Sequence, residues 1–124
     1  MQHGLALGWC MIALCWASLA HAAGDPAAGE AAFKKSCAAC HTTDAGNNKV
    51  GPSLHGVVGR RAASLAGYAY SDALKKADKT WDDQTLDAYL ANPRAAVPGT
   101  KMVFLGLKSE DDRQNVIAYL ESQK

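Results

Sequence analysis

Residues 37–41 read Cys37-Ala38-Ala39-Cys40-His41, and this stretch decides the fold because it predicts what the chain folds around. Two cysteines separated by two residues and followed at once by a histidine are typical of a covalent c-type haem attachment site. Each thiol can add to a vinyl group of haem, and the adjacent imidazole can supply an axial nitrogen to the iron. The sequence therefore predicts one haem c bound through Cys37 and Cys40, with His41 as an iron ligand.

Two other kinds of site use a similar pair of cysteines. A thioredoxin-like redox pair requires a surrounding βαβ pattern, whereas the pair here lies between an alanine-rich helical stretch and a glycine-rich loop. A zinc site requires further cysteine or histidine ligands at close spacing, and downstream of His41 only His55 is available. Haem attachment is therefore the favoured interpretation.

The N-terminal segment predicts where the protein works. Residues 5–19 are almost wholly apolar, and Ala20-His21-Ala22 then places small residues at the two positions that a signal peptidase reads. We expect residues 1–22 to be a cleaved signal peptide that directs the protein to the periplasm. No Lys or Arg precedes the apolar run, so an uncleaved anchor remains the alternative, although the run is short for a membrane span.

Residues 23–124 have the length of one small domain, which we expect to hold a single haem. Only Cys37 and Cys40 remain in this part of the chain, and if both bind haem, no disulfide is available to stabilise the fold. The porphyrin must then supply part of the hydrophobic core. The formal net charge of the whole chain is +1, which gives no basis for nucleic-acid binding.

The periodicity of the sequence predicts an all-α fold, with four helical segments and no alternating strand pattern. The first helix begins at Asp25-Pro26 and leads to the haem cysteines, and a short one runs from Ser71 to Lys76. A third follows Trp81 and stops at Asn92-Pro93, and the last begins at Ser109.

Gly29 interrupts the first helix at a cost that requires a physical reason. We expect close approach of the last helix there, so that the N-terminal and C-terminal helices cross.

Two irregular segments complete the expected site. The loop between His41 and Tyr70 is long and rich in glycine, which is unusual in a small domain unless the loop wraps a ligand. Pro98 and Gly99 indicate an extended loop and not a helix, so Met102, which follows them, lies on irregular backbone. Met102 is also the only methionine after residue 22, and therefore the only thioether available as a second iron ligand.

The chain resembles the class I c-type cytochromes, and within them mitochondrial-type cytochrome c and its bacterial periplasmic relatives. The resemblance covers nearly the whole of residues 23–124, and beyond the attachment motif it rests on ordered matches. These are Gly51-Pro52-Ser53-Leu54-His55-Gly56, Tyr68-Ala69-Tyr70-Ser71-Asp72-Ala73, Trp81, Tyr89-Leu90, Asn92-Pro93, Pro98-Gly99-Thr100-Lys101-Met102-Val103-Phe104 and Ile117-Ala118-Tyr119-Leu120.

The resemblance implies a role for each matching residue. It implies that His41 and Met102 are the axial ligands and that the Pro52 carbonyl accepts a hydrogen bond from the other imidazole nitrogen. It also implies that Tyr70 and Trp81 donate hydrogen bonds to a haem propionate and that Arg60 is a nearby positive charge. It further implies that the Tyr89 hydroxyl lies beside the methionine sulfur and that the Phe104 ring covers the haem face. His55 is the rival sixth ligand, although a histidine in so tight a turn more often bonds to backbone.

The resemblance implies a periplasmic electron carrier and not an enzyme. A ligand on each side of the iron leaves no open position for substrate, so the site exchanges single electrons. We expect a monomer that docks weakly through Lys34, Lys35, Arg94 and Lys101 with respiratory or photosynthetic partners. Candidate partners are a membrane cytochrome complex, a terminal oxidase or reductase, and a periplasmic dehydrogenase. The alternatives are a dedicated haem subunit of such a dehydrogenase, or peroxidase activity after Met102 dissociates.

Overall fold

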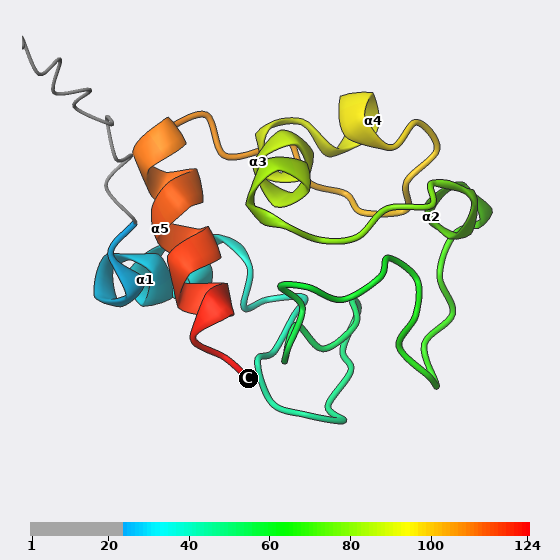
Figure 1. The fold of residues 1–124 in the computed structure, drawn as a ribbon, viewed down its shortest axis with the longest axis horizontal. Coiled ribbons are helices and arrows are strands. Elements are labelled where there is room, and N and C mark those ends of the chain that lie inside the picture. The colour runs from blue at the N-terminus through cyan, green and yellow to red at the C-terminus, as the bar shows by residue number, and fades with distance from the viewer. Residues whose placement is uncertain (1–23) are drawn as a thin grey trace, which may run out of the picture.

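The computed structural model describes residues 24–124, and in this part of the chain all the regular elements are helices (Figure 1). The helices are α1 (Pro26–Ser36), α2 (Asp72–Lys76), α3 (Asp83–Ala91), α4 (Pro93–Ala96) and α5 (Glu110–Glu121). Extended pairing within the described residues is limited to an isolated bridge between Arg61 and Thr80. The predicted all-α fold is confirmed, while the predicted signal peptide lies outside the described residues.

Each of the expected helices begins at a side chain that caps it. Asp25 accepts a hydrogen bond from the Ala27 amide at the start of α1, where Pro26 occupies the first helical position. Ser71, Asp82 and Ser109 accept equivalent bonds at the starts of α2, α3 and α5. None of the helices formed by residues 24–124 is long and apolar enough to span a membrane.

Helix α4 was not among the four helices expected from the sequence. Asn92-Pro93 predicts the end of a helix, and α3 does end at Ala91. The Asn92 side chain then accepts a hydrogen bond from the Ala95 amide, and Pro93 takes the first position of a new one-turn helix. The same two residues therefore stop one helix and start the next.

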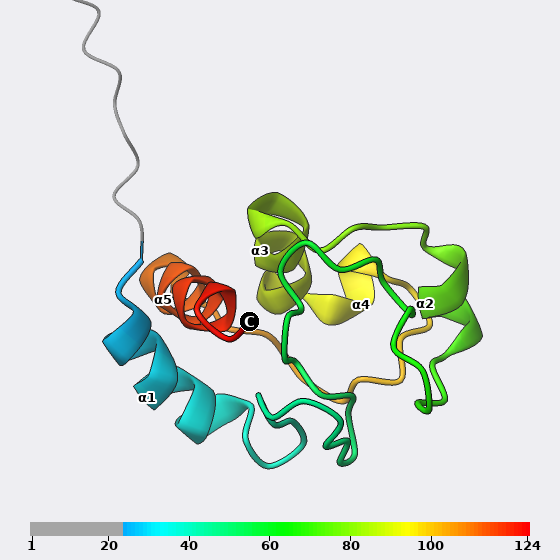
Figure 2. The same cartoon turned by 60° about the horizontal axis from the view of Figure 1, so that its bottom comes forward.

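The two terminal helices pack against each other, as the sequence predicted (Figures 1 and 2). Gly29 is buried at the contact, where a methyl group on its Cα would overlap the backbone carbonyl of Asn115 in α5. The rings of Phe33 and Tyr119 meet one turn further along, with their centroids 5.4 Å apart. Close backbone approach thus explains a glycine inside α1.

The hydrophobic core joins α5 to α3 and to α1. Val116, Ile117 and Leu120 of α5 are buried with Leu86 and Leu90 of α3. Residues 37–70 and 97–107 form no α-helix (Figure 2). Val57, Ala62 and Val97 of these two segments are buried in the same core. These two irregular segments, together with α3 and α5, enclose the candidate site.

Candidate haem-binding site

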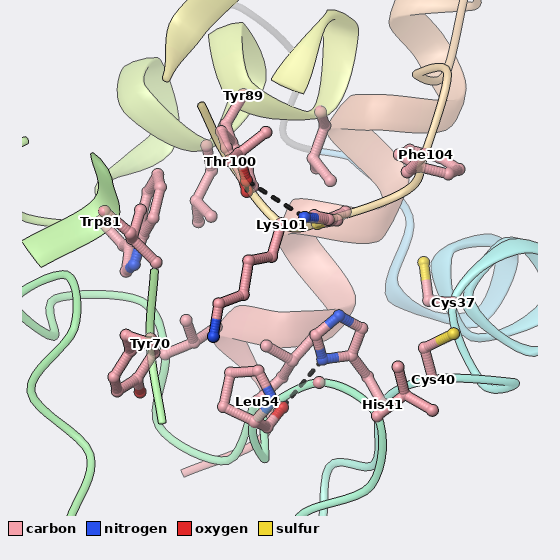
Figure 3. Close-up of a pocket in the computed structure, with 18 of the residues that line it drawn as sticks. Cys37, Cys40, His41, Leu54, Tyr70, Trp81, Tyr89, Thr100, Lys101 and Phe104 are labelled. Carbon is pink, nitrogen blue, oxygen red and sulfur yellow. Dashed lines mark hydrogen bonds between the residues drawn. The ribbon is translucent and has the colours of Figure 1, made fainter. Parts of the chain in front are cut away.

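A cavity of about 520 Å³ opens between the two irregular segments and the core (Figure 3). Its volume lies within the roughly 300–1,000 Å³ typical of cofactor and ligand pockets. Most of its lining is apolar or aromatic side chain, and every site residue predicted from the sequence contributes to it. Those residues are Cys37, Cys40, His41, Pro52, Arg60, Tyr70, Trp81, Tyr89, Met102 and Phe104.

Cys37 and Cys40 lie at the rim of the cavity, where α1 ends (Figure 3). The amides of residues 40 and 41 both donate to the Cys37 carbonyl, at 3.1 and 3.0 Å, so the motif forms one tight turn. Neither sulfur is in a disulfide. Burial raises the pKa of the Cys37 thiol to about 11, so in the free protein this sulfur is protonated at neutral pH. Both sulfurs are thus available for thioether bonds on one side of the cavity.

His41 points into the cavity from the end of the same turn (Figure 3). Its Nδ1 donates to the Pro52 carbonyl at 2.8 Å, which leaves the lone pair of Nε2 as the free position of the ring. Burial lowers the pKa of His41 below its ordinary 6.5, so the imidazole is neutral at pH 7. A neutral imidazole whose other nitrogen is bonded to a backbone carbonyl has the state that a metal ligand requires.

The segment that carries Met102 lines the cavity across from His41, with Thr100 and Phe104 marking its two ends in Figure 3. The Thr100 hydroxyl is 2.7 Å from the hydroxyl of Tyr89, and it also accepts the Met102 amide at 3.3 Å. Burial raises the pKa of Tyr89, which therefore stays protonated at neutral pH. Tyr89 thus contacts the methionine segment through Thr100.

Polar groups gather in the part of the cavity that Tyr70 and Trp81 line (Figure 3). The Tyr70 oxygen accepts the Leu65 amide at 3.3 Å, so its own proton remains available to another acceptor. The Arg60 guanidinium donates to the backbone carbonyls of Ser53 and His55, both at 3.0 Å. This arrangement holds a positive charge near two potential donors.

His55, the rival ligand, does not line the cavity. Its Nδ1 lies 3.2 Å from the Thr43 carbonyl, within hydrogen-bond distance. The expectation that this histidine bonds to backbone is therefore confirmed, and within residues 24–124 the cavity takes its imidazole from His41.

Three residues with structural roles at the site were not identified from the sequence. Gly51 is buried against the His41 ring, Thr100 connects Tyr89 to the methionine segment, and the Lys49 ammonium donates to the Ala38 carbonyl at 2.6 Å. Gly51 and Thr100 fall within matched motifs, but the motifs do not show what each side chain or backbone atom touches. These contacts join residues that are separated in the chain, which local patterns do not reveal.

The cavity fits a covalently bound haem. Its walls are apolar, two thiols stand at its rim, a neutral imidazole enters from one side, and a thioether segment lines it across from that imidazole. The thioredoxin-like alternative does not fit, because the described residues form helices with no βαβ unit. Fold and site together define a small, all-α haem protein.

The chain belongs to the cytochrome c family. The match to this family, described as Cytochrome c, covers residues 26–124. It is 53% identical over 112 residues to cytochrome c2 of Rhodomicrobium vannielii, a match that covers 90% of this chain and 89% of that protein. It is 50% identical over 101 residues to cytochrome c of Arabidopsis thaliana, which covers 81% of this chain and 90% of the plant protein. Cytochrome c of Nigella damascena is 49% identical over 100 residues, a match that covers 80% of this chain and 90% of that protein. The chain is therefore an electron-transfer protein that binds haem c through Cys37 and Cys40.

Proposed function

We propose that this protein is a periplasmic electron carrier in which His41 and Met102 are the two axial ligands. The observation that carries this proposal is that a neutral imidazole and the only described thioether line the same cavity, from segments on different sides of it. Bound haem supplies reversible one-electron chemistry at its iron. A soft, neutral thioether favours the reduced state, so Met102 raises the potential relative to a second histidine.

The remaining side chains of the cavity hold and shield the cofactor. We assign Tyr70 and Trp81 as donors to a propionate, because the Tyr70 proton is uncommitted and Trp81 is buried at the same end. Arg60 supplies positive charge there while its guanidinium is fixed by two backbone carbonyls. Phe104 and Tyr89 exclude water from the side that carries Met102.

Secretion to the periplasm is supported by the sequence of residues 1–22 and by the similarity to a bacterial cytochrome c2. The match to that relative covers 90% of the chain, which is more than residues 24–124, so it extends into the N-terminal segment. Intact mass and N-terminal sequencing of protein recovered from the periplasm would test this. Cleavage after Ala22 is expected, whereas a full-length chain in the membrane fraction would support an anchor instead.

Docking with redox partners is assigned to basic side chains near the attachment motif and the methionine segment. Lys34 is paired with Glu30 at 2.6 Å, while the ion pairs formed by residues 24–124 include none of Lys35, Arg94 and Lys101. The Lys101 ammonium lies at the cavity and donates to the Ala69 carbonyl at 3.1 Å, so Lys35 and Arg94 are the charges more available than Lys34 to steer a partner that carries negative charge (Figure 3). Carriers of this kind bind weakly and release quickly.

Charge reversal separates local steering from the effect of net charge. Lys35→Glu should slow electron transfer with an acidic partner and weaken its dependence on ionic strength. Lys76→Glu changes the net charge equally, but on α2, and should have a smaller effect. Equal effects of the two variants would exclude steering through the Lys35 region. Isolation of the protein with a stoichiometric second chain would instead favour a dehydrogenase subunit.

A further inference from the structure

Residues 49–52, here called the 49–52 segment, lie against the haem attachment motif along its whole length. The Lys49 ammonium donates to the Ala38 carbonyl at 2.6 Å, and the Gly51 amide donates to the Cys40 carbonyl at 2.8 Å. The Pro52 carbonyl accepts the bond from His41. Three of the four residues in this segment are therefore bonded to the turn that carries the cysteines and the imidazole.

Gly51 is the point where this segment meets the His41 ring. Gly51 is buried, and a methyl group on its Cα would lie 2.6 Å from Nδ1 and 2.7 Å from Nε2, and would overlap Cε1 between them. Atoms do not approach so closely without displacement, so the ring or the segment would have to move. The backbone at Gly51 thus occupies the space beside the Cε1 corner of the imidazole.

Backbone conformation does not explain a glycine at this position. The described glycines in the left-handed region are Gly46, Gly56, Gly59, Gly67, Gly99 and Gly106, and Gly51 is not among them. Alanine could therefore adopt the backbone angles found at residue 51. The requirement for glycine comes from the imidazole itself.

We propose that Gly51 is a positioning residue that sets the rotation of the His41 imidazole, an inference that rests on the proposed role of His41 as a ligand. The ring is fixed at two places, by the hydrogen bond from Nδ1 to Pro52 and by the backbone of Gly51 beside Cε1. The hydrogen bond limits rotation of the ring about its Cβ–Cγ bond only within the angular tolerance of a hydrogen bond. The second contact narrows that range.

The far side of the 49–52 segment is also anchored, so it does not simply yield to the ring. The Tyr68 hydroxyl donates to the Val50 carbonyl at 2.7 Å, and the Tyr68 ring packs edge-on against Tyr70, with centroids 4.8 Å apart. The segment lies between Tyr68 on one side and His41 on the other. Added volume at residue 51 is therefore transmitted to the imidazole.

The orientation of an axial imidazole can be read from the ferric holoprotein without measuring activity. The plane of the ring, together with the orientation of the thioether, sets which iron orbital holds the unpaired electron, and the hyperfine-shifted haem-methyl resonances in the proton NMR spectrum report this orbital. Gly51→Ala should change the order or spread of those resonances. The near-infrared band of iron–thioether bonding should persist in the variant, because Met102 is not touched.

Gly29→Ala is the matched control, because a methyl group there also overlaps existing atoms, but those of the Asn115 carbonyl at the contact between α1 and α5. It should lower stability and leave the haem-methyl pattern of the wild type. If Gly51→Ala also keeps that pattern, Gly51 has only a packing role and the proposal is overturned. If the wild-type protein itself shows no resonances from a ligated His41, the proposed function fails, and the two failures are distinguished.

A second variant keeps the proposal testable if Gly51→Ala does not accumulate as holoprotein. Tyr68→Phe removes the anchor of the Val50 carbonyl without adding an atom, so the 49–52 segment is loosened and not displaced. A smaller change in the same resonances is expected. An unchanged haem-methyl pattern in Tyr68→Phe would then overturn the proposal.

Discussion

On one side of the cavity the His41 ring is held directly, by a hydrogen bond of 2.8 Å to Pro52 and by the buried backbone of Gly51, whereas on the other side Met102 is held through the backbone of its segment. From residue 98 to 104 the hydrogen bonds run mostly within the segment or to its immediate neighbours. The exceptions are Thr100 with Tyr89 and the Lys101 ammonium with the Ala69 carbonyl.

Solvent exposure does not by itself separate the two sides. Val103 and Leu105 on the Met102 side are 91% and 80% exposed, but Val50, next to the buried Gly51 on the His41 side, is also 77% exposed. The difference lies in the contacts: the His41 ring is held directly by Pro52 and Gly51, whereas residues 98–104 are bonded mostly to their own neighbours. A segment held in this way opens at lower free energy than the core, so we expect the Met102 side to open first.

The largest effect is expected at the helix crossing that supports the His41 side. Gly29→Ala forces α1 away from the Asn115 carbonyl, and we expect the free energy of unfolding to fall by about 2–3 kcal/mol. Guanidinium unfolding of the holoprotein measures this loss. Ala28→Gly, at an exposed position of the same helix, should cost only the helix propensity of about 1 kcal/mol. A Gly29→Ala variant as stable as the wild type would show that the contact between α1 and α5 accommodates a methyl group, which would contradict this prediction.

A smaller and more local effect is expected on the Met102 side. Thr100→Val removes the contact with the Tyr89 hydroxyl and the acceptor of the Met102 amide, so opening of the segment should become easier by about 1 kcal/mol. The near-infrared band of thioether ligation should then be lost at lower denaturant concentration, with global unfolding changed less. Peroxidase activity should rise in parallel, because an open side admits peroxide.

Thr43→Val is the control for this prediction, because its hydroxyl also faces a tyrosine, Tyr119, at 3.4 Å, away from the cavity. It should leave the loss of the near-infrared band unchanged. If both valine variants shift that transition equally, the Met102 side has no special dependence on Thr100.

The smallest effect is expected at the cap of α3, the helix that carries Tyr89. Hydrogen bonds from the Thr85 amide and hydroxyl lower the pKa of Asp82 below its ordinary 3.8. A lowered pKa stabilises the fold above pH 3.8, and this contribution disappears as the pH falls through the folded value. Asp82→Asn should therefore lower the melting temperature slightly at pH 7, and the difference should vanish in acid. A difference independent of pH would assign the effect to packing and not to charge.

Much of the fold could be predicted from the sequence because its signals are local. Asp25, Ser71 and Ser109 each precede a helix that they cap, and Cys37 to His41 identify the cofactor within five residues. The crossing of the terminal helices was also predictable, because a glycine that weakens a helix is typical of a place where another backbone comes close.

The contacts that orient the site could not be predicted in this way. Gly51 touches His41 ten residues away, and Thr100 contacts Tyr89 across α4. Periodicity and capping describe neighbours along the chain, while these contacts depend on how the loops fold around the cavity. The restart of helix at Asn92 was missed because a proline that stops one helix also suits the first position of another.

The most direct test of the account is the near-infrared spectrum of the ferric holoprotein, compared between the wild type and Met102→Ala. The wild type should show the weak band that iron–thioether bonding produces, and the variant should stay folded and lose it. A folded wild-type protein without the band, or a Met102→Ala variant that keeps it, would contradict ligation by Met102.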